Sequence, residues 1–314
     1  MVLVPAGPFA TIGDFKAEVL RRLRPEDDVV ARRATRVELL VGGTALADGE
    51  GVERCVGGVL AVLSQRRVDC VRWGGEELRD VLLVVPEGME EVEEEAFDGC
   101  QGLLAVALPW SLRRIGQRAF RNCRAVSSLR LPEGVTEIGD RAFSMCGALA
   151  ELTIPKSVRH IGEGAFCGCG SITHLSLPDS ISRIESEAFS GLISLRSLTI
   201  PEFVRVIEER AFDGCSSLLT LNIPNSVTTI GVEAFNGCSS LSTLTLSNSV
   251  AEIRTGAFSG CRALPELRIP SSVSRLDAGA FEDCLSLMRL TLPKSVSCLA
   301  CFAGCPSNCE VVRF

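Results

Sequence analysis

Residues 208–230, EERAFDGCSSLLTLNIPNSVTTI, contain the pattern that determines the fold of this chain. Phe212 is followed three residues later by Cys215, and the run L-x-x-L-x-I then leads to Pro224. The same order returns in the next 23 residues, GVEAFNGCSSLSTLTLSNSVAEI, which end at Ile253. Self-similarity at a fixed period is typical of solenoid proteins, so the first inference is a chain built from stacked repeats.

The repeat continues through nine units with a constant step of 23 residues. The most regular column holds the phenylalanines Phe97, Phe120, Phe143, Phe166, Phe189, Phe212, Phe235, Phe258 and Phe281. Each Phe is followed by the column cysteine except in the fifth unit, where Leu192 takes that place. Proline closes each L-x-x-L-x-L/I run except at Ser247. One unit buries too little apolar surface to fold alone, so the columns are expected to stack and form one continuous core.

The pattern within a unit predicts its local structure. The end of the L-x-x-L-x-L run alternates apolar and polar residues, which is typical of a β-strand. Proline then ends the strand, because it has no N–H group for a ladder. The segment Val-x-x-Ile-Gly predicts a second short extended piece, and Glu-x-Ala-Phe-x-Gly-Cys predicts a tight helical turn. The expected fold is a right-handed coil with a parallel sheet along one side and short extended or helical turns along the other.

These residues resemble the BspA-like class of leucine-rich repeats. The shared pattern is IG-x-x-AF-x-GC-x-x-L-x-x-L-x-IP, which recurs from about Val81 to Phe314. The departures are Leu192, Ser247 and a last unit that is two residues shorter. The resemblance implies a protein-binding solenoid, which we place at residues 71–314 with about nine full units and terminal caps.

The first seventy residues do not follow the repeat. The segments TIGDFKAEV (11–19), RVELLVGGTALADG (36–49) and GVLAVLS (58–64) predict a helix and two strands. In this order they resemble a ubiquitin-like (β-grasp) domain at residues 1–70 with an incomplete opening hairpin. The resemblance implies an alternative function, an adaptor of the ubiquitin pathway that is recognised through this module.

Composition narrows the class of protein. The chain has 314 residues, 46% of them hydrophobic, but no apolar run long enough to cross a membrane. Residues 1–14 lack the pattern of a secretory signal, so we expect a cytoplasmic or nuclear protein with reduced thiols, even though it has 15 cysteines. Residues 73–314 carry 21 Lys and Arg against 29 Asp and Glu, which argues against a nucleic-acid partner.

Candidate catalytic groups are few. The only histidines are His160 and His174, and the repeat places them on different segments of the coil. Cys167 and Cys169 form a C-x-C pair, but the repeat directs them to different sides. We therefore predict that the protein is not an enzyme and needs no cofactor.

The C-terminal cysteines allow two interpretations. Cys298, Cys301, Cys305 and Cys309 have the approximate spacing of metal ligands, which permits a site with four thiolates as the weaker alternative. The favoured interpretation is a terminal cap with small apolar thiols. In that cap Cys309 begins a last strand that ends in Val312 and Phe314.

The predicted binding face consists of the two outward positions between the leucine columns of each strand. This face is polar, shallow and extended, so it suits a protein or peptide better than a small molecule. The partner is expected to contact Arg130, Glu151, Thr153, His174, Ser176, Thr199, Asn222, Thr245, Glu266, Arg268 and Arg289. Trp110 and Phe203, just after strand-ending prolines, are the candidate aromatic anchors.

Overall fold

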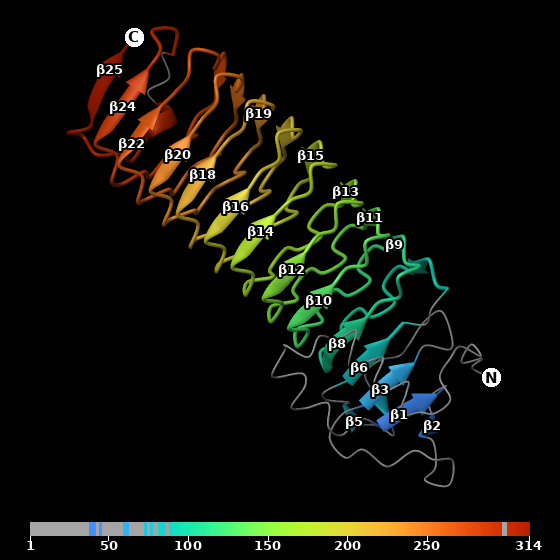
Figure 1. Ribbon diagram of the computed structural model, residues 1–314. Helices are drawn as coiled ribbons and strands as arrows, with labels where there is room; N and C mark the ends of the chain where they lie inside the picture. Colours follow the sequence, from blue (N-terminus) through green and yellow to red (C-terminus); the bar gives the residue numbers. More distant parts are fainter. Residues whose placement is uncertain are drawn as a thin grey trace.

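The computed structural model describes residues 81–85, 88–296 and 300–314, together with five short strands within residues 38–77. The chain forms a solenoid of stacked coils, and two sets of parallel strands run along its length (Figure 1). This is the leucine-rich-repeat architecture that the 23-residue period predicts.

The first set of strands comes from the L-x-x-L-x-L runs and forms the broad face of the solenoid. Hydrogen-bonded neighbours are parallel and offset by one repeat, as in Leu129 beside Leu152 and Leu175 beside Leu198. The members of this set are β6 (Val81–Val84), β8 (Leu103–Ala107), β10 (Ser128–Arg130), β12 (Glu151–Thr153), β14 (His174–Ser176), β16 (Ser197–Thr199), β18 (Thr220–Asn222), β20 (Thr243–Thr245), β22 (Glu266–Arg268), β24 (Arg289–Leu292) and β25 (Glu310–Arg313).

The second set comes from the Val-x-x-Ile segments and confirms the predicted second extended piece. Each strand has two residues, and its Ile, Val or Leu points to the core while the residue before it is more exposed. The members are β7 (Glu91–Val92), β9 (Arg114–Ile115), β11 (Glu137–Ile138), β13 (His160–Ile161), β15 (Arg183–Ile184), β17 (Val206–Ile207), β19 (Thr229–Ile230), β21 (Glu252–Ile253) and β23 (Arg275–Leu276).

The segments around Ala-Phe form hydrogen-bonded turns, and the expected helical turn is not a helix. The reason lies in two left-handed positions per coil, such as Glu95 (φ 54°) and Gly99 (φ 75°), because a right-handed helix cannot continue through them. Successive turns bond to each other instead, as from the Phe97 N–H to the Ala119 carbonyl (2.7 Å). In the described part of the chain the one helical element is the 3-10 helix η2 (Ala300–Phe302).

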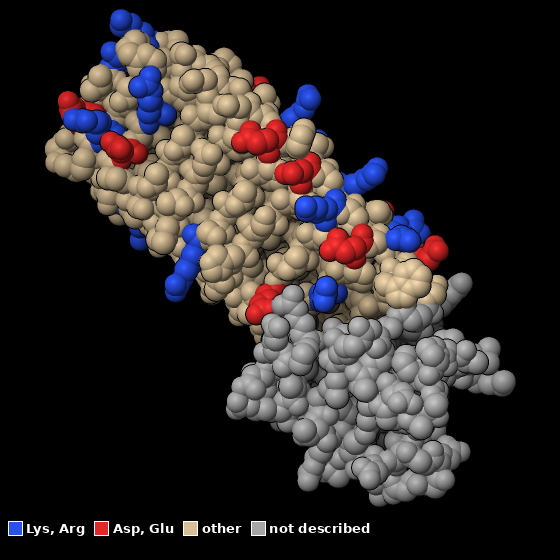
Figure 2. Space-filling model, in the orientation of Figure 1, with Lys and Arg blue, Asp and Glu red and all other residues tan. Residues whose placement is uncertain are grey.

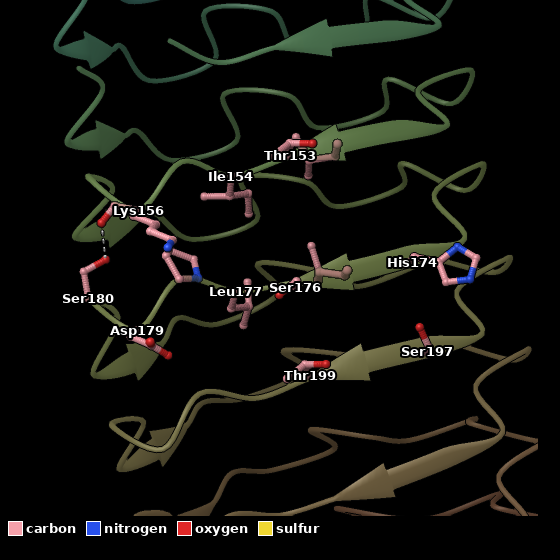
Figure 3. Close-up of a pocket in the computed structure, with 13 residues that line it drawn as sticks. Thr153, Ile154, Lys156, His174, Ser176, Leu177, Asp179, Ser180, Ser197 and Thr199 are labelled. Atoms are coloured by element: carbon pink, nitrogen blue, oxygen red, sulfur yellow. Dashed lines mark hydrogen bonds between the residues drawn. The ribbon is translucent and has the colours of Figure 1, made fainter. Parts of the chain in front are cut away.

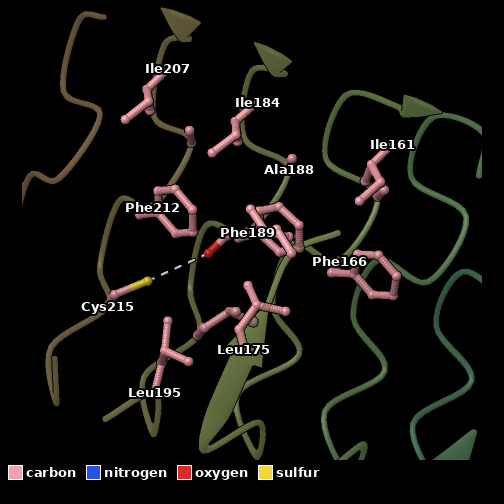
Figure 4. Packing of buried hydrophobic residues seen from close by; sticks show 14 of the residues in the cluster. Ile161, Phe166, Leu175, Ile184, Ala188, Phe189, Leu195, Ile207, Phe212 and Cys215 are labelled. Carbon is pink, nitrogen blue, oxygen red and sulfur yellow. Dashed lines mark hydrogen bonds between the residues drawn. The ribbon is translucent and has the colours of Figure 1, made fainter. Parts of the chain in front are cut away.

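The core is a stack of identical side chains, as the columns predict. All nine column phenylalanines are buried, and Phe302 extends the stack at its C-terminal end. Neighbouring rings are parallel within 13°, with centroids 5.0–5.7 Å apart. The column thiols lie beside this stack and donate to a carbonyl of the preceding coil, as from Cys215 Sγ to the Phe189 oxygen (Figure 4). The cysteines thus fill space and also satisfy a backbone acceptor.

Among the described residues, five strands precede the repeats; two of them extend the broad sheet in parallel, and a third pairs antiparallel at its edge. The predicted strands at 36–41 and 59–63 are present as β1 (Glu38–Val41) and β3 (Val59–Val62), and β3 pairs in parallel with both β1 and β6. The others are β2 (Thr44–Ala45), antiparallel to β1, and the antiparallel pair β4 (Arg72–Trp73) and β5 (Glu76–Glu77).

The predicted domain boundary at residue 70 falls within this sheet, since β1 and β3 lie before it and β6 after it. Most of residues 1–70 lie outside the described residues. The ubiquitin-like domain therefore stays a prediction.

The last strand differs from the expected cap by one residue. In β25, Val311 rather than Val312 aligns with the inward Leu290 of β24, and Arg313 aligns with Leu292. Both valines are substantially exposed, and Cys309 is partly buried just before the strand. Val311 lies nine residues after Phe302, as Leu290 does after Phe281, so β25 keeps the repeat register when it is counted from Phe302.

Candidate functional site

The outward positions of the broad face are accessible along most of the solenoid. The predicted contact residues are all exposed: Arg130, Glu151, Thr153, His174, Ser176, Thr199, Asn222, Thr245, Glu266, Arg268 and Arg289. They lie on strands β10 to β24 and point away from the core, because side chains alternate along a strand. The structure thus brings them onto one surface, and their contact with a partner stays a prediction.

At the N-terminal end the same face is covered. Ala105 and Ala107 occupy the outward positions of β8, and both are buried. They were expected to be exposed, and the repeat pattern offers no sign that this strand is covered on both sides. The accessible face therefore begins at β10.

The predicted anchors Trp110 and Phe203 are exposed, with 72% and 62% of their surface accessible. Each follows the proline that ends a strand, so they lie beside the outward rows and not in them. Their role in binding stays a prediction.

Charge is unevenly distributed over the accessible surface. From β14 to β20 the outward residues are His, Ser, Thr and Asn, without a carboxylate, lysine or arginine. Figure 2 shows few charged side chains over these strands. More of them lie along the edge of the solenoid near strands β9, β11, β13 and β15. A partner would meet hydroxyl groups in the middle of the face and charges at its ends.

Two of the charged side chains at the C-terminal end already have intramolecular partners. The Arg268 guanidinium lies over the Phe314 ring, 5.0 Å from its centroid, and Arg289 Nε lies 3.3 Å from Glu310 Oε2. Binding through either arginine would compete with these contacts.

The broad face also contains a groove at the level of β12, β14 and β16, which we call the β12–β14 groove. Its volume is about 510 Å³. It is lined by Leu152, Thr153, Ile154, Lys156, His174, Leu175, Ser176, Leu177, Pro178, Asp179, Ser180, Ser197 and Thr199. Figure 3 shows Lys156, Asp179 and Ser180 at one end, and His174 and Ser197 at the other. The His174 ring has a local partner, since its Nδ1 lies 2.9 Å from the Thr173 hydroxyl.

The groove coincides with an interruption of the sheets. Among the described strands, β12 and β14 share no ladder hydrogen bond, and neither do β13 and β15. The turns of the same two coils remain bonded, from the Phe166 N–H to the Ala188 carbonyl (2.9 Å) and from the Gly168 N–H to the Ser190 carbonyl (2.8 Å). These two coils are joined along the turn side and separated along both strand sides.

The groove contains His174, Ser176, Thr153 and Thr199, which were predicted as contact residues, and Ser197, which is an outward residue of the predicted face. Lys156, Asp179 and Ser180 were not predicted. Lys156 and Asp179 hold the same place in successive repeats, directly after the strand-ending proline. The alignment of these two residues can be recognised in the sequence. The groove that opens beside them cannot be predicted from it.

The remaining candidate groups are not assembled into a site. His160 and His174 are exposed on different strand sets, in β13 and β14. Among the described residues, no three His, Cys, Asp or Glu side chains are placed to hold a metal ion.

The cysteines of the C-terminal cluster are not alike. Cys298 lies outside the described residues, Cys301 is disulfide-bonded, and Cys305 and Cys309 are free thiols. The expectation that the thiols are reduced is therefore wrong at Cys301. A disulfide sulfur is also not a thiolate, so Cys301 in this state cannot serve as one of the four proposed ligands.

The column thiols are chemically protected by their burial. Removal from water disfavours the thiolate, so the pKa values of Cys215 and Cys261 are raised to about 12. They are therefore protonated at neutral pH, and a protonated thiol is a poor nucleophile.

No helix within the described ranges has the length and apolar character needed to cross a membrane.

Several solved structures are similar to the chain. A leucine-rich repeat protein of T. pallidum (TpLRR) is 36% identical, over 51% of this chain and 77% of that one, with a TM-score of 0.48. A leucine-rich cell surface protein of Faecalibacterium prausnitzii is 24% identical, over 88% and 87% of the two chains, with a TM-score of 0.46. The pneumococcal vaccine antigen PcpA is 18% identical, over 88% of this chain and 75% of that one, with a TM-score of 0.52. At this identity, the likeness to PcpA supports the fold alone.

No curated protein is similar enough to the chain to count as a relative. The family described as BspA type leucine-rich repeat region (6 copies) matches residues 81–196 and 182–309, most of the chain. These ranges contain the stacked coils and the accessible face described above. The chain belongs to the BspA-type leucine-rich-repeat family.

Proposed function

We propose that the protein is a binding scaffold that presents the outward face of β10 to β24 to a protein or peptide partner. The observation that carries this proposal is the separation of roles along each strand: inward residues build the core, while outward residues are exposed or partly exposed and lie outside it. An extended polar surface of this kind suits a macromolecular ligand. A protein that holds a partner needs no assembled catalytic group, and we propose that this chain is not an enzyme.

The test uses the full chain, immobilised, with capture of partners from cell extract as the readout. The face variants change charge at exposed positions and leave the core intact: Asn222→Arg adds a charge, and Arg130→Glu and Glu266→Arg each reverse one. The matched control is Arg159→Glu. Arg159 is also exposed, and it lies just before β13, a strand of the second set and not of the broad face. We expect at least one face variant to lose a captured protein that the control retains. Equal capture by all variants would overturn the proposed face.

The alternative of a ubiquitin-pathway adaptor rests on residues 1–70, most of which lie outside the described residues. Deletion of that whole segment would also remove β1 and β3 from the sheet. A sharper comparison deletes residues 1–35 only, before the first described strand. Selective loss of a ubiquitin-pathway protein would favour the adaptor, whereas unchanged capture would favour the scaffold alone.

The partner's nature and location also belong to this proposal. The acidic repeat region makes a nucleic acid an unfavourable ligand, because like charges repel. A cytoplasmic or nuclear location stays a prediction, and the F. prausnitzii neighbour is described as a cell surface protein. Fractionation of cells that express the chain would decide between these locations.

A further inference from the structure

We propose that the C-terminal edge of the broad sheet is a dimer interface, at which strand β25 pairs antiparallel with β25 of a second copy of this chain. The inference goes beyond the proposed function, because it concerns the end of the solenoid and not the partner of its face. Three features of the structure support it: the open main-chain edge of β25, its exposed apolar side chains, and the fit of these groups to a second copy of the same strand.

The main chain of β25 is bonded on one side only. This strand lies at the C-terminal end of the solenoid, next to β24 (Figure 1). The N–H groups of Glu310 and Phe314 donate to carbonyls of the β24 segment, at 2.8 and 3.0 Å. Main-chain groups of successive residues in a strand point to opposite sides, so the N–H and C=O groups of Val311 and Arg313 point away from β24. No other described strand pairs with this edge, which is therefore open to a further ladder.

The same strand exposes apolar side chains that other coils bury or replace. Val311 holds the inward position beside Leu290, yet 52% of its surface is accessible, against 3% for Leu290. Phe302, the last ring of the stack, is only partly buried. Val312 is exposed at a position that is polar in every strand from β10 to β24, and Phe314 beside it is also exposed. Terminal units of soluble repeat proteins need a polar outer surface, so this apolar end indicates a contact.

A second copy of β25 fits this edge because the strand is complementary to itself. In an antiparallel pair, opposed residues either exchange both main-chain hydrogen bonds or exchange none, and the two kinds alternate along the ladder. When Val311 of each copy lies opposite Arg313 of the other, every open N–H and C=O group of these residues gains a partner. This register is symmetric about a two-fold axis normal to the sheet. A two-fold contact closes after two copies, so the expected assembly is a dimer and not a filament.

The side chains also match in this register. Val312 lies on the two-fold axis and faces Val312 of the second copy. Such a pair is of the non-hydrogen-bonded kind, in which the Cα atoms are about 4.5 Å apart and the side chains are in contact. On the inward side, Val311 faces the aliphatic stem of Arg313, whose guanidinium donates to the Val296 carbonyl of its own copy (2.7 Å).

The charges agree with this arrangement. Glu310 comes opposite Phe314 of the second copy, the ring over which Arg268 lies at 5.0 Å from the centroid. Each Glu310 carboxylate would thus approach a cation of the other copy. The two Glu310 residues lie about 14 Å apart along the paired strands, which exceeds the Debye length of about 8 Å in physiological salt. Main-chain bonds alone would accept any strand, but the valine pair and these charges favour a second copy.

The test is the oligomeric state of the full chain, measured by sedimentation velocity from about 1 to 100 µM, the range in which a small interface associates. Val312→Lys and Val312→Glu each place like charges opposite one another on the axis, which is unfavourable in a cross-strand pair. An equal mixture of the two variants brings opposite charges together. The control is Thr245→Lys, which adds a charge at the same outward position of β20, away from the edge.

We expect dimers of the wild type and of Thr245→Lys, association of each Val312 variant alone that is weaker by about tenfold or more, and recovery of dimers in the mixture. Circular dichroism confirms that each variant is folded. A wild type that is monomeric over the whole range, or a Val312→Lys variant that associates like wild type, would overturn the interface. Failure of the mixture to recover dimers would overturn the two-fold register. Partner capture does not enter this test, so either failure leaves the proposed scaffold function unaffected.

Discussion

In β18 the inward Leu221 is buried, whereas Thr220 and Asn222 on either side of it are exposed. The inward column is Leu in every coil from β10 to β24, but the outward column changes from Arg130 to Ser176 to Arg268. The inward residue must match identical residues above and below it, because a stacked core leaves no room for a different shape. The outward residue meets solvent and is free to vary. In this chain the inward residues are therefore the same from coil to coil, whereas the outward residues vary.

The largest difference between the two regions should appear on removal of a ring. We predict that Phe212→Ala lowers the free energy of unfolding by about 3–5 kcal/mol, because Phe212 is fully buried between two stacked neighbours. Phe203→Ala removes the same atoms from a residue with 62% of its surface exposed, and should cost less than about 0.5 kcal/mol. Urea unfolding followed by circular dichroism measures both. Equal losses would contradict the assignment of inner and outer positions.

A smaller effect is expected from the column thiols at alkaline pH. Unfolded cysteine has a pKa of about 8.5, whereas burial raises that of Cys215 and Cys261 to about 12. Below pH 8.5 both states are protonated and the full stability is present. As the pH rises towards 12, only the unfolded state loses protons, so stability falls by up to about 1.4 kcal/mol per pH unit for each thiol.

Unfolding experiments between pH 7 and pH 10 test this sign. The Cys215→Ala, Cys261→Ala double variant is less stable at pH 7 but should show a shallower decline, because two titrating groups are absent. The chain has no tyrosine, so phenol ionisation does not contribute to the slope. Parallel declines for wild type and double variant would show that burial does not protect these thiols.

The smallest effect is expected from the ion pairs at the surface. Arg121 donates two hydrogen bonds to Asp98, from Nε to Oδ1 (2.9 Å) and from Nη2 to Oδ2 (2.5 Å). Both side chains are half-buried. We predict a coupling energy of about 0.5–1 kcal/mol in a double-mutant cycle, reduced by high salt. The single, more exposed contact between Arg289 and Glu310 should couple less strongly. A larger coupling energy for Arg289–Glu310 than for Arg121–Asp98 would contradict the expected effect of geometry and burial.

Much of the fold was predictable because stacking repeats the same constraint in every coil. The Phe column, the two strands per unit and the exposure of residues such as Asn222 follow directly from the 23-residue period. The failures occur where the repeat is altered or ends. Ala105 is buried on the outward side, and β25 shifts its inward residue from Val312 to Val311. Before β6 the chain departs from the regular repeat, so a pattern derived from identical neighbours does not apply to Ala105. In β25 the repeat does apply, because Val311 lies nine residues after Phe302 as Leu290 does after Phe281, and the expected alignment was one residue too far along.

The candidate site divides in the same way. Membership of the outward rows was predicted, because alternation along a strand depends on the local sequence alone. The β12–β14 groove was not, since it requires the combined spacing of two coils, one of which carries Leu192.

The amino-acid sequence by itself determined the solenoid, its period and which residues face the core, because these depend on a local pattern that every coil repeats. Only the tertiary structure decided where neighbouring coils separate, which charges remain unpaired and where the outward face is covered. These features depend on distances between segments 20 or more residues apart, which no local pattern encodes.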